Sequence, residues 1–278
     1  MKEKSYQVID KNMLDKGRFP RVAAYLNASR DHFLVITDFL LYECMRGNSA
    51  RNFSTDFSRL VPYVEQLVVL ETADVIARFE PRREGLPGRL ISLEDTELIR
   101  RHLRSSLHGL DSKGPSQSFL DFSAKCRLFR DGLLGKSNDM RACLDEIIQA
   151  LPKNEISKIR RDEPSSELFQ WQLFNQIGRF AAGLYQDNIP LPTEPSGIYA
   201  LQFRYAAAYV FLAIDWRLCG LEVSRSETDT IHNDAIDLTY ITYATFFDGL
   251  LCDDQRALRV FQRTMAFIEN LLVRFRMI

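Results

Sequence analysis

Short apolar runs alternate with helix-like segments across the first 80 residues, and this alternation limits the chain to few folds. The runs at 6–10, 33–37 and 67–70 have the length and composition of buried strands. Residues 22–26, 38–46 and 54–66 between them have helical spacing. Parallel strands need long connections, and a helix is the usual one. The pattern therefore predicts an α/β fold built on a parallel sheet.

Acidic residues stand at the ends of two of the apolar runs. The first run ends at Asp10, and a run near the other end of the chain leads into Asp253 and Asp254. Ligands of open α/β sheets bind in the crevice beyond the carboxyl ends of the strands. If the two strands are parallel neighbours, we expect these acids to converge there. The simpler interpretation is that Asp253 and Asp254 cap the helix predicted at 255–275.

Further candidate acids lie on predicted helices. Asp234 and Asp237 are three residues apart, so they share one face of a helix. Glu43 falls in the second turn of the segment 38–46. On a face with Leu40, and directed toward Asp10, it would be a metal ligand or a base. The alternative is an ordinary solvated glutamate.

The middle of the chain has a different pattern. A polar connector rich in proline and glycine begins at Pro81, and helical spacing follows to about residue 226. We expect a core of residues 1–80 and 228–278, split by a mainly α-helical insertion lobe at 81–227. The aromatic residues of this lobe predict a packed core rather than a base-stacking surface. The helices predicted there span 94–108, 117–132, 138–150, 166–185 and 197–219.

Composition narrows the classes of function. The 278 residues carry a net charge of -1, which argues against non-specific coating of nucleic acid. The five cysteines are scattered without C-x-x-C spacing, so neither a zinc site nor a disulfide framework is predicted. No segment has the length and apolarity of a signal peptide or a membrane span, and we expect a cytoplasmic protein without a membrane partner.

Four segments together resemble PIN-domain nucleases. Residues 8–14 resemble the D-x-N-x-L opening of that family, and residues 35–43 resemble its second strand and glutamate-bearing helix. Residues 233–237 and 247–254 are similar to its closing half, where a helical acid precedes a strand that ends in a Thr/Ser-x-Asp motif. The resemblance covers roughly residues 5–80 and 228–275 and implies a Rossmann-like, PIN-like core.

The resemblance implies a divalent-metal-dependent endoribonuclease. Hydrolysis of a phosphodiester needs hard cations held by oxygen ligands, such as Mg²⁺ or Mn²⁺. Four acids in one crevice repel each other without metal, so cation binding should also stabilise the fold. Glu43 would orient the metal-bound water, and Asp254 is preferred to Asp253 as a ligand. The acids implied as direct, water-mediated or supporting ligands are Asp10, Asp234, Asp237, Asp253 and Asp254.

Two positions depart from the family pattern, and two others have secondary roles. Lys11 replaces the usual small residue after the first acid, and Cys252 occupies the Thr/Ser position. Lys11 would either weaken cation binding or contact a phosphate. Asn12 would position the backbone after Asp10 or bind a phosphate, and Thr37 would hydrogen-bond the first acid.

The implied partner is an RNA substrate, such as a structured RNA, and single-stranded DNA stays open as a substrate. The helical lobe would supply specificity or bind a protein partner, such as an antitoxin, and a homo-oligomer is also open. By analogy, the implied roles include a toxin or an antiphage defence effector. The alternative is a catalytically silent PIN-like module that binds nucleic acid or protein.

A third hypothesis places the chemistry in the helical lobe. Arg101 and His108 match the R-x6-H spacing of some helical ribonucleases, although such a pair often arises by chance. If that lobe is the functional centre, RNA cleavage should persist in EDTA and disappear in His108→Ala. If the acids are the centre, we expect EDTA to abolish cleavage and His108→Ala to retain it.

Overall fold

The computed structural model describes residues 4–44, 55–79, 86–107, 121, 124, 137–161, 163–184, 195–221 and 228–276. The chain forms two compact units, each assembled from separate stretches of sequence. The first unit contains residues 1–76, 85–133 and 246–255. The second contains residues 77–84, 134–245 and 256–278. No helix in the described part of the chain is long and apolar enough to cross a membrane.

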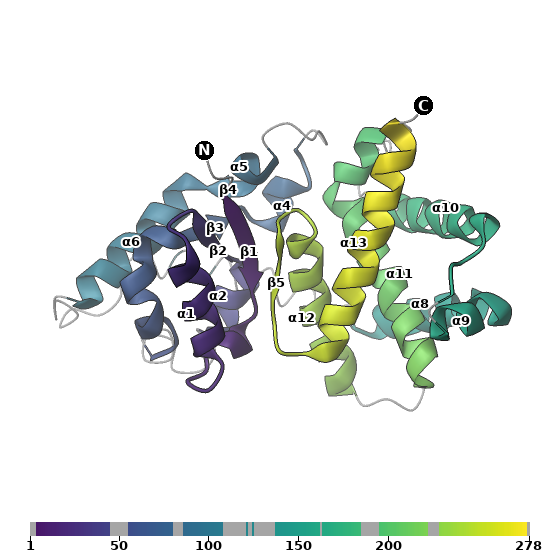
Figure 1. The fold of residues 1–278 in the computed structure, drawn as a ribbon, viewed down its shortest axis with the longest axis horizontal. Coiled ribbons are helices and arrows are strands. Elements are labelled where there is room, and N and C mark those ends of the chain that lie inside the picture. The colour runs from purple at the N-terminus through teal and green to yellow at the C-terminus, as the bar shows by residue number, and fades with distance from the viewer. Residues whose placement is uncertain are drawn as a thin grey trace. The chain divides into compact units, whose positions relative to one another are not determined.

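A five-stranded sheet forms the centre of the first unit, with strand order β4-β3-β2-β1-β5 (Figure 1). Strands β3, β2, β1 and β5, which are neighbours in that order, pair in parallel, and β4 is antiparallel to β3. The α/β class predicted from the alternating pattern is confirmed. The strands are β1 (Ser5–Ile9), β2 (His32–Ile36), β3 (Leu67–Leu70), β4 (Ile91–Ser92) and β5 (Gly249–Leu251).

The closing strand β5 is fixed to β1 at both of its ends. Asp248, just before β5, accepts a hydrogen bond from the Tyr6 amide at 2.6 Å and donates its own amide to the Tyr6 carbonyl at 2.8 Å. At the other end, the Asp10 amide donates to the Leu251 carbonyl at 2.9 Å. Because the strands are parallel neighbours, Asp10 and the residues after Leu251 emerge at the same edge of the sheet.

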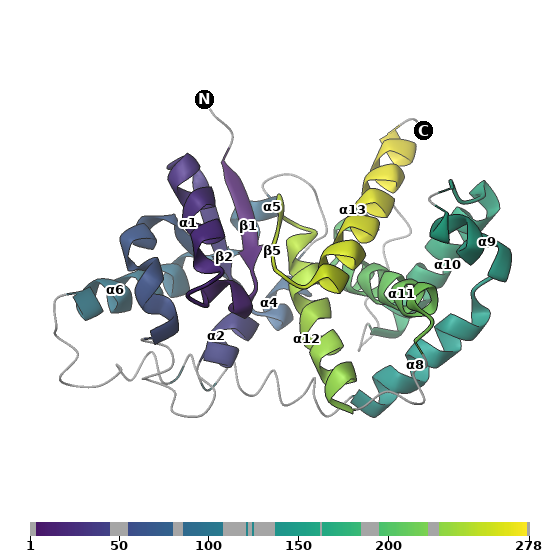
Figure 2. The same cartoon turned by 60° about the horizontal axis from the view of Figure 1, so that its bottom comes forward.

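Helices cover the sheet and extend beyond its carboxyl edge. In the first unit, α1 packs against β2 and α6 against β3 (Figure 1). In Figure 2, β1 runs downward from the N-terminus, and α2 lies below its end. The helical elements of this unit are η1 (Lys11–Leu14), α1 (Phe19–Ala28), α2 (Asp38–Cys44), η2 (Ser58–Gln66), α4 (Ala73–Ile76), α5 (Leu86–Leu90) and α6 (Leu93–Leu107).

Two elements of the first unit differ from what the sequence pattern predicts. The segment 58–66 is a 3₁₀ helix, because Pro62 cannot donate a backbone hydrogen bond and Tyr63 leaves the helical conformation. Helix α6, predicted within the insertion lobe, is bound to the sheet: the Thr96 hydroxyl accepts from the Val69 amide at 2.8 Å. The two compact units therefore have other bounds than the predicted core and insertion lobe. The division of the chain into these two domains remains a prediction.

The second unit is helical and is organised around α11. Most of the residues along α11 are buried, including Trp216, which explains why this helix has no polar face. It ends at Gly220, whose φ of 68° lies in the left-handed region. The predicted helix 117–132 lies outside the described residues, apart from 121 and 124. The elements here are α8 (Ser137–Ala150), α9 (Lys153–Arg160), α10 (Glu167–Leu184), η4 (Pro195–Tyr199), α11 (Leu201–Cys219), α12 (Thr228–Ala244) and α13 (Gln255–Arg276).

A buried carboxylate joins α11 to α13. Asp215 is fully buried, and its two oxygens accept hydrogen bonds from Arg259 at 3.1 and 3.2 Å and from Arg263 at 2.8 Å. A buried charge is tolerated when charged hydrogen-bond donors compensate its desolvation. The two arginines therefore make this carboxylate compatible with an otherwise apolar helix.

We expect the Arg259→Met/Arg263→Met double variant to lose about 3–5 kcal/mol of unfolding free energy, because Asp215 would remain as an uncompensated buried charge. Adding Asp215→Asn to the double variant should recover most of this loss. Urea unfolding of the four proteins, including Asp215→Asn alone, measures both effects. An equal loss with and without Asp215→Asn would contradict the compensation.

Candidate active site

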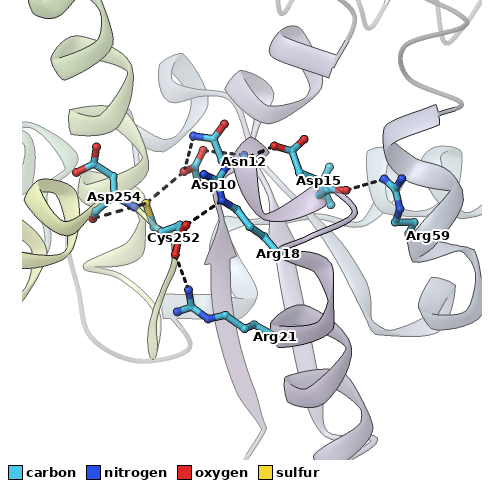
Figure 3. A network of polar contacts seen from close by, with 10 residues as sticks. Asp10, Asn12, Asp15, Arg18, Arg21, Arg59, Cys252 and Asp254 are labelled. Carbon is cyan, nitrogen blue, oxygen red and sulfur yellow. Dashed lines mark hydrogen bonds and ion pairs between the residues drawn. The ribbon is translucent and has the colours of Figure 1, made fainter.

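Asp10 is buried where β1 ends, at the carboxyl edge of the sheet (Figure 3). Its Oδ1 accepts from the Asn12 amide at 3.3 Å, and its Oδ2 accepts from Asn12 Nδ2 at 3.4 Å. The Cys252 thiol, which follows β5, donates to Oδ2 at 3.2 Å. Neutral donors from the segments that follow β1 and β5 therefore hold this carboxylate.

The charge of Asp10 is poorly compensated. Burial raises the pKa of its carboxyl above the ordinary value, and the charge of Asp254 adds to this rise, whereas the hydrogen bonds from Cys252 and Asn12 lower the pKa. Among the residues that the structure describes, no Lys or Arg forms an ion pair with Asp10. A bound cation would supply the missing positive charge.

Cys252 connects Asp10 to the loop that carries Asp254. Its sulfur accepts from the Asp254 amide at 3.2 Å while its thiol reaches Asp10. The thiol is buried, and Asp254 is exposed. Cys252 thus makes, with a sulfur atom, the two contacts that a hydroxyl could make at the position where the resemblance expects Thr or Ser.

Asp253 is paired with two arginines near the start of α1. Its Oδ2 accepts from Arg18 Nε at 2.8 Å, and its Oδ1 accepts from Arg21 Nη1 at 2.9 Å. All three side chains are well exposed. In Figure 3, Arg18 and Arg21 extend from α1 toward the loop after β5. The preference for Asp254 over Asp253 as a ligand stays a prediction.

Asp234 and Asp237 both lie on α12 in the second unit. Asp234 is buried, accepts from Trp216 Nε1 at 2.7 Å and is paired with Arg256 at 3.0 Å. Asp237 is half-buried. Because Asp10, Asp253 and Asp254 belong to the first unit, a joint site that includes Asp234 or Asp237 stays a prediction. A cation that bound Asp234 would compete with Arg256.

Glu43 is half-buried on α2, in the first unit. Burial raises the pKa of the adjacent Cys44 thiol, and the charges of Asp56 and Glu43 raise it further, whereas Lys11 lowers it. Glu43 and Lys11 therefore act electrostatically on the same thiol. Helix α2 packs against η1, which directly follows Asp10, and the role of Glu43 with a metal-bound water stays a prediction.

The start of α2 contains a buried carboxylate that the sequence analysis did not select. Thr37 accepts from the Leu40 amide at 3.1 Å and thereby caps the helix. Asp38 is buried, its Oδ1 accepts from the Phe39 amide at 2.9 Å, and its Oδ2 has no hydrogen-bond partner among the described residues. Burial raises the pKa of Asp38 to about 7, and the charge of Asp74 contributes.

The donor set at the carboxyl edge is suited to a hard cation that keeps part of its water shell. Within the described ranges, no three His, Cys, Asp or Glu side chains form a group that could hold a metal ion. Mg²⁺ usually keeps several waters and is bound by one or two carboxylates together with substrate phosphates. Asp10 and Asp254 could provide two such carboxylates, so these residues are compatible with Mg²⁺ or Mn²⁺.

Comparison with known proteins adds no assignment: no family model, curated protein or solved structure matches the chain. The resemblance to PIN-domain nucleases remains an interpretation of the sequence. His108, the basis of the R-x6-H hypothesis, lies outside the described residues.

Sequence reasoning missed three residues at this edge. Asp38 is the first residue of a predicted helix, where acids are common as caps, and its burial is visible only in the folded chain. Arg18 and Arg21 were not singled out, although their spacing of three residues places them on one helix face. Their contact with a residue 235 positions from Arg18 depends on the pairing of β1 with β5.

We expect Asp38→Asn to stabilise the protein at high pH. The folded-state pKa of about 7 lies above the ordinary 3.8, so stability contributed by protonated Asp38 is present below about pH 4 and is lost as the pH rises through 7. The substitution should raise the unfolding free energy at pH 8 by up to about 4 kcal/mol relative to wild type. Urea unfolding between pH 4 and 8 tests this difference.

Asp74→Asn provides an intermediate variant for the same measurement, because it removes a charge that raises the pKa of Asp38. Its stability should fall less steeply with pH than that of wild type. Parallel pH profiles for wild type and Asp38→Asn would show that Asp38 does not titrate in this way.

Proposed function

We propose that the chain is a divalent-metal-dependent endoribonuclease whose catalytic centre includes Asp10 and Asp254. The observation that carries this proposal is the environment of Asp10. It is a buried acid beside a second acid, held only by neutral donors among the described residues. The buried acids Asp215 and Asp234, in contrast, are paired with arginine. A carboxylate with this environment is suited to a cation.

The position of the two acids supports the same conclusion. They follow adjacent parallel strands, at the edge where open α/β sheets bind their ligands. Asn12 and Cys252 restrict the orientation of the Asp10 carboxylate, so little reorganisation would be needed on cation binding. A bound Mg²⁺ or Mn²⁺ would activate water and stabilise negative charge on the phosphodiester.

The resemblance extends this proposal to the substrate and to further residues. It favours RNA, and it adds Glu43 as the residue that orients water and Asp234 or Asp237 as additional ligands. The toxin or antiphage defence role and a protein partner at the helical lobe rest on the same analogy.

We expect the wild-type chain to cleave RNA with Mg²⁺ or Mn²⁺ and to lose this activity in EDTA. Asp10→Asn should lower the cleavage rate at least about 100-fold, because a metal ion contributes several kcal/mol to transition-state stabilisation. The assay uses labelled single-stranded, hairpin and tRNA-like RNAs, with single-stranded DNA for comparison. Thermal unfolding with and without Mn²⁺ should show stabilisation of wild type that is reduced in Asp10→Asn.

Asp31→Asn is the matched control, because Asp31 precedes β2 and therefore lies at the amino edge of the sheet. Its activity and Mn²⁺ response should equal those of wild type. If wild type binds these RNAs without cleaving any of them in the presence of metal, the silent nucleic-acid-binding module replaces the enzyme.

A further inference from the structure

Arg18 and Arg21 form a pair of cations at the N-terminus of α1. Arg18 is the N-cap residue, Arg21 lies three positions later, and the first turn of the helix contains no acid. The N-terminus of a helix carries a partial positive charge, which makes cations unfavourable there and anions favourable. The two guanidinium groups and the helix dipole therefore combine into one positive region.

Asp253 now occupies this positive region. Each of its two carboxylate oxygens bonds to a different arginine, and Arg18 also contacts Asp15 at 3.4 Å. A guanidinium has five N–H donors. The side-chain contacts within the described residues use two N–H donors of Arg18 and one of Arg21. The remaining N–H groups of the two guanidinium groups could therefore bind another anion.

The arginine pair lies immediately beside the candidate active site. Asp253 stands between Cys252, which contacts Asp10, and Asp254. Successive Cα atoms are only about 3.8 Å apart, so an anion at the arginines would be a close neighbour of the acids. Figure 3 shows the two arginines and Asp10 around the same short loop.

An exchange of anions at this position would cost little. The side chains of Arg18, Arg21 and Asp253 are 42%, 55% and 40% exposed, and ion pairs between exposed groups contribute little to stability. A phosphate offers oxygen acceptors that arginine binds strongly, often through two parallel hydrogen bonds.

We propose that Arg18 and Arg21 bind a backbone phosphate of the nucleic-acid substrate, next to the scissile bond, and that Asp253 occupies this phosphate site in the absence of substrate. The inference rests on the proposed nuclease function for its substrate class. It assigns Asp253 to the substrate-binding surface rather than to the metal, and it makes the two arginines positioning residues for the cleaved strand.

Binding is measured separately from cleavage. Fluorescence anisotropy of a labelled 12-nucleotide single-stranded RNA in EDTA, over a series of salt concentrations, reports the affinity of the full chain. Arg18→Gln and Arg21→Gln should each weaken binding about 10-fold and reduce the slope of log affinity against log salt by about 1, because each removes one phosphate contact. Arg30→Gln removes the same charge from an exposed residue beyond the other end of α1 and should leave the affinity within about 2-fold.

Asp253→Asn gives the sharpest test, because Asp253 as an occupant of a phosphate site, as a structural ion-pair partner and as a metal ligand predict different results. If Asp253 occupies a phosphate site, its neutralisation should tighten RNA binding by about 2- to 5-fold. Weaker binding would show that the ion pairs only hold the loop, and loss of cleavage with unchanged RNA binding would identify Asp253 as a metal ligand. Either result would overturn the inference.

The two proposals can fail separately. Asp10-dependent cleavage with no effect of Arg18→Gln or Arg21→Gln on affinity would leave the nuclease standing and remove the phosphate site. RNA binding that depends on both arginines, without any cleavage, would keep the phosphate site and remove the nuclease. Inorganic phosphate added at increasing concentration should compete with RNA at the arginines, and equal competition in the double variant Arg18→Gln/Arg21→Gln would place the competed site elsewhere.

Discussion

The parallel pairing of β1 with β5 is the contact on which the candidate site depends. It joins segments from opposite ends of the sequence, and the Cys252–Asp10 hydrogen bond that follows it connects residues 242 positions apart. Closing so long a loop is entropically unfavourable. The two hydrogen bonds between Asp248 and Tyr6 help to offset this cost by fixing the start of a strand of only three residues. A one-residue change of register would send alternate side chains to the opposite face of the sheet. The position of every acid after β5 is therefore set by this pairing.

The buried acids of the chain differ in how their charge is compensated, and this difference separates structural roles from the candidate chemical one. Asp215 is held by two arginines, and Asp234 by one arginine and an indole. These carboxylates complete ion pairs that a cation would have to break. Asp10 has neutral donors and a second acid nearby, and one oxygen of Asp38 has no hydrogen bond within the part of the chain that the structure describes. Burial without compensation favours either a proton or a cation, which makes these two residues the chemically sensitive ones.

Much of the fold follows from local sequence pattern, and most of the site geometry does not. Strands β1, β2 and β3 could be predicted from short apolar runs, and Asp10 was selected because it ends the first of these runs. Each of these signals lies within a few residues of sequence. The two-residue β4 has too little length for a periodic signal, and Pro62 changed a predicted α-helix into a 3₁₀ helix. The convergence of Asp10 with Asp254 could be predicted only on the condition that their strands pair. The partners of Asp234 and Asp253 come from distant helices, and no local pattern specifies them.

The late position of β5 in the sequence also has a consequence for biosynthesis. Domains generally fold as units while the chain is being made, beginning at the N-terminus. Strands β1 to β4 are available early, but β1 has an unpaired edge until residues 249–251 have been synthesised. During that interval Asp10 lacks the thiol of Cys252 and the neighbouring acids of the same loop. The proposed catalytic centre would therefore be assembled only after residues 249–254 have been synthesised, and a nascent chain that stops before them would lack it.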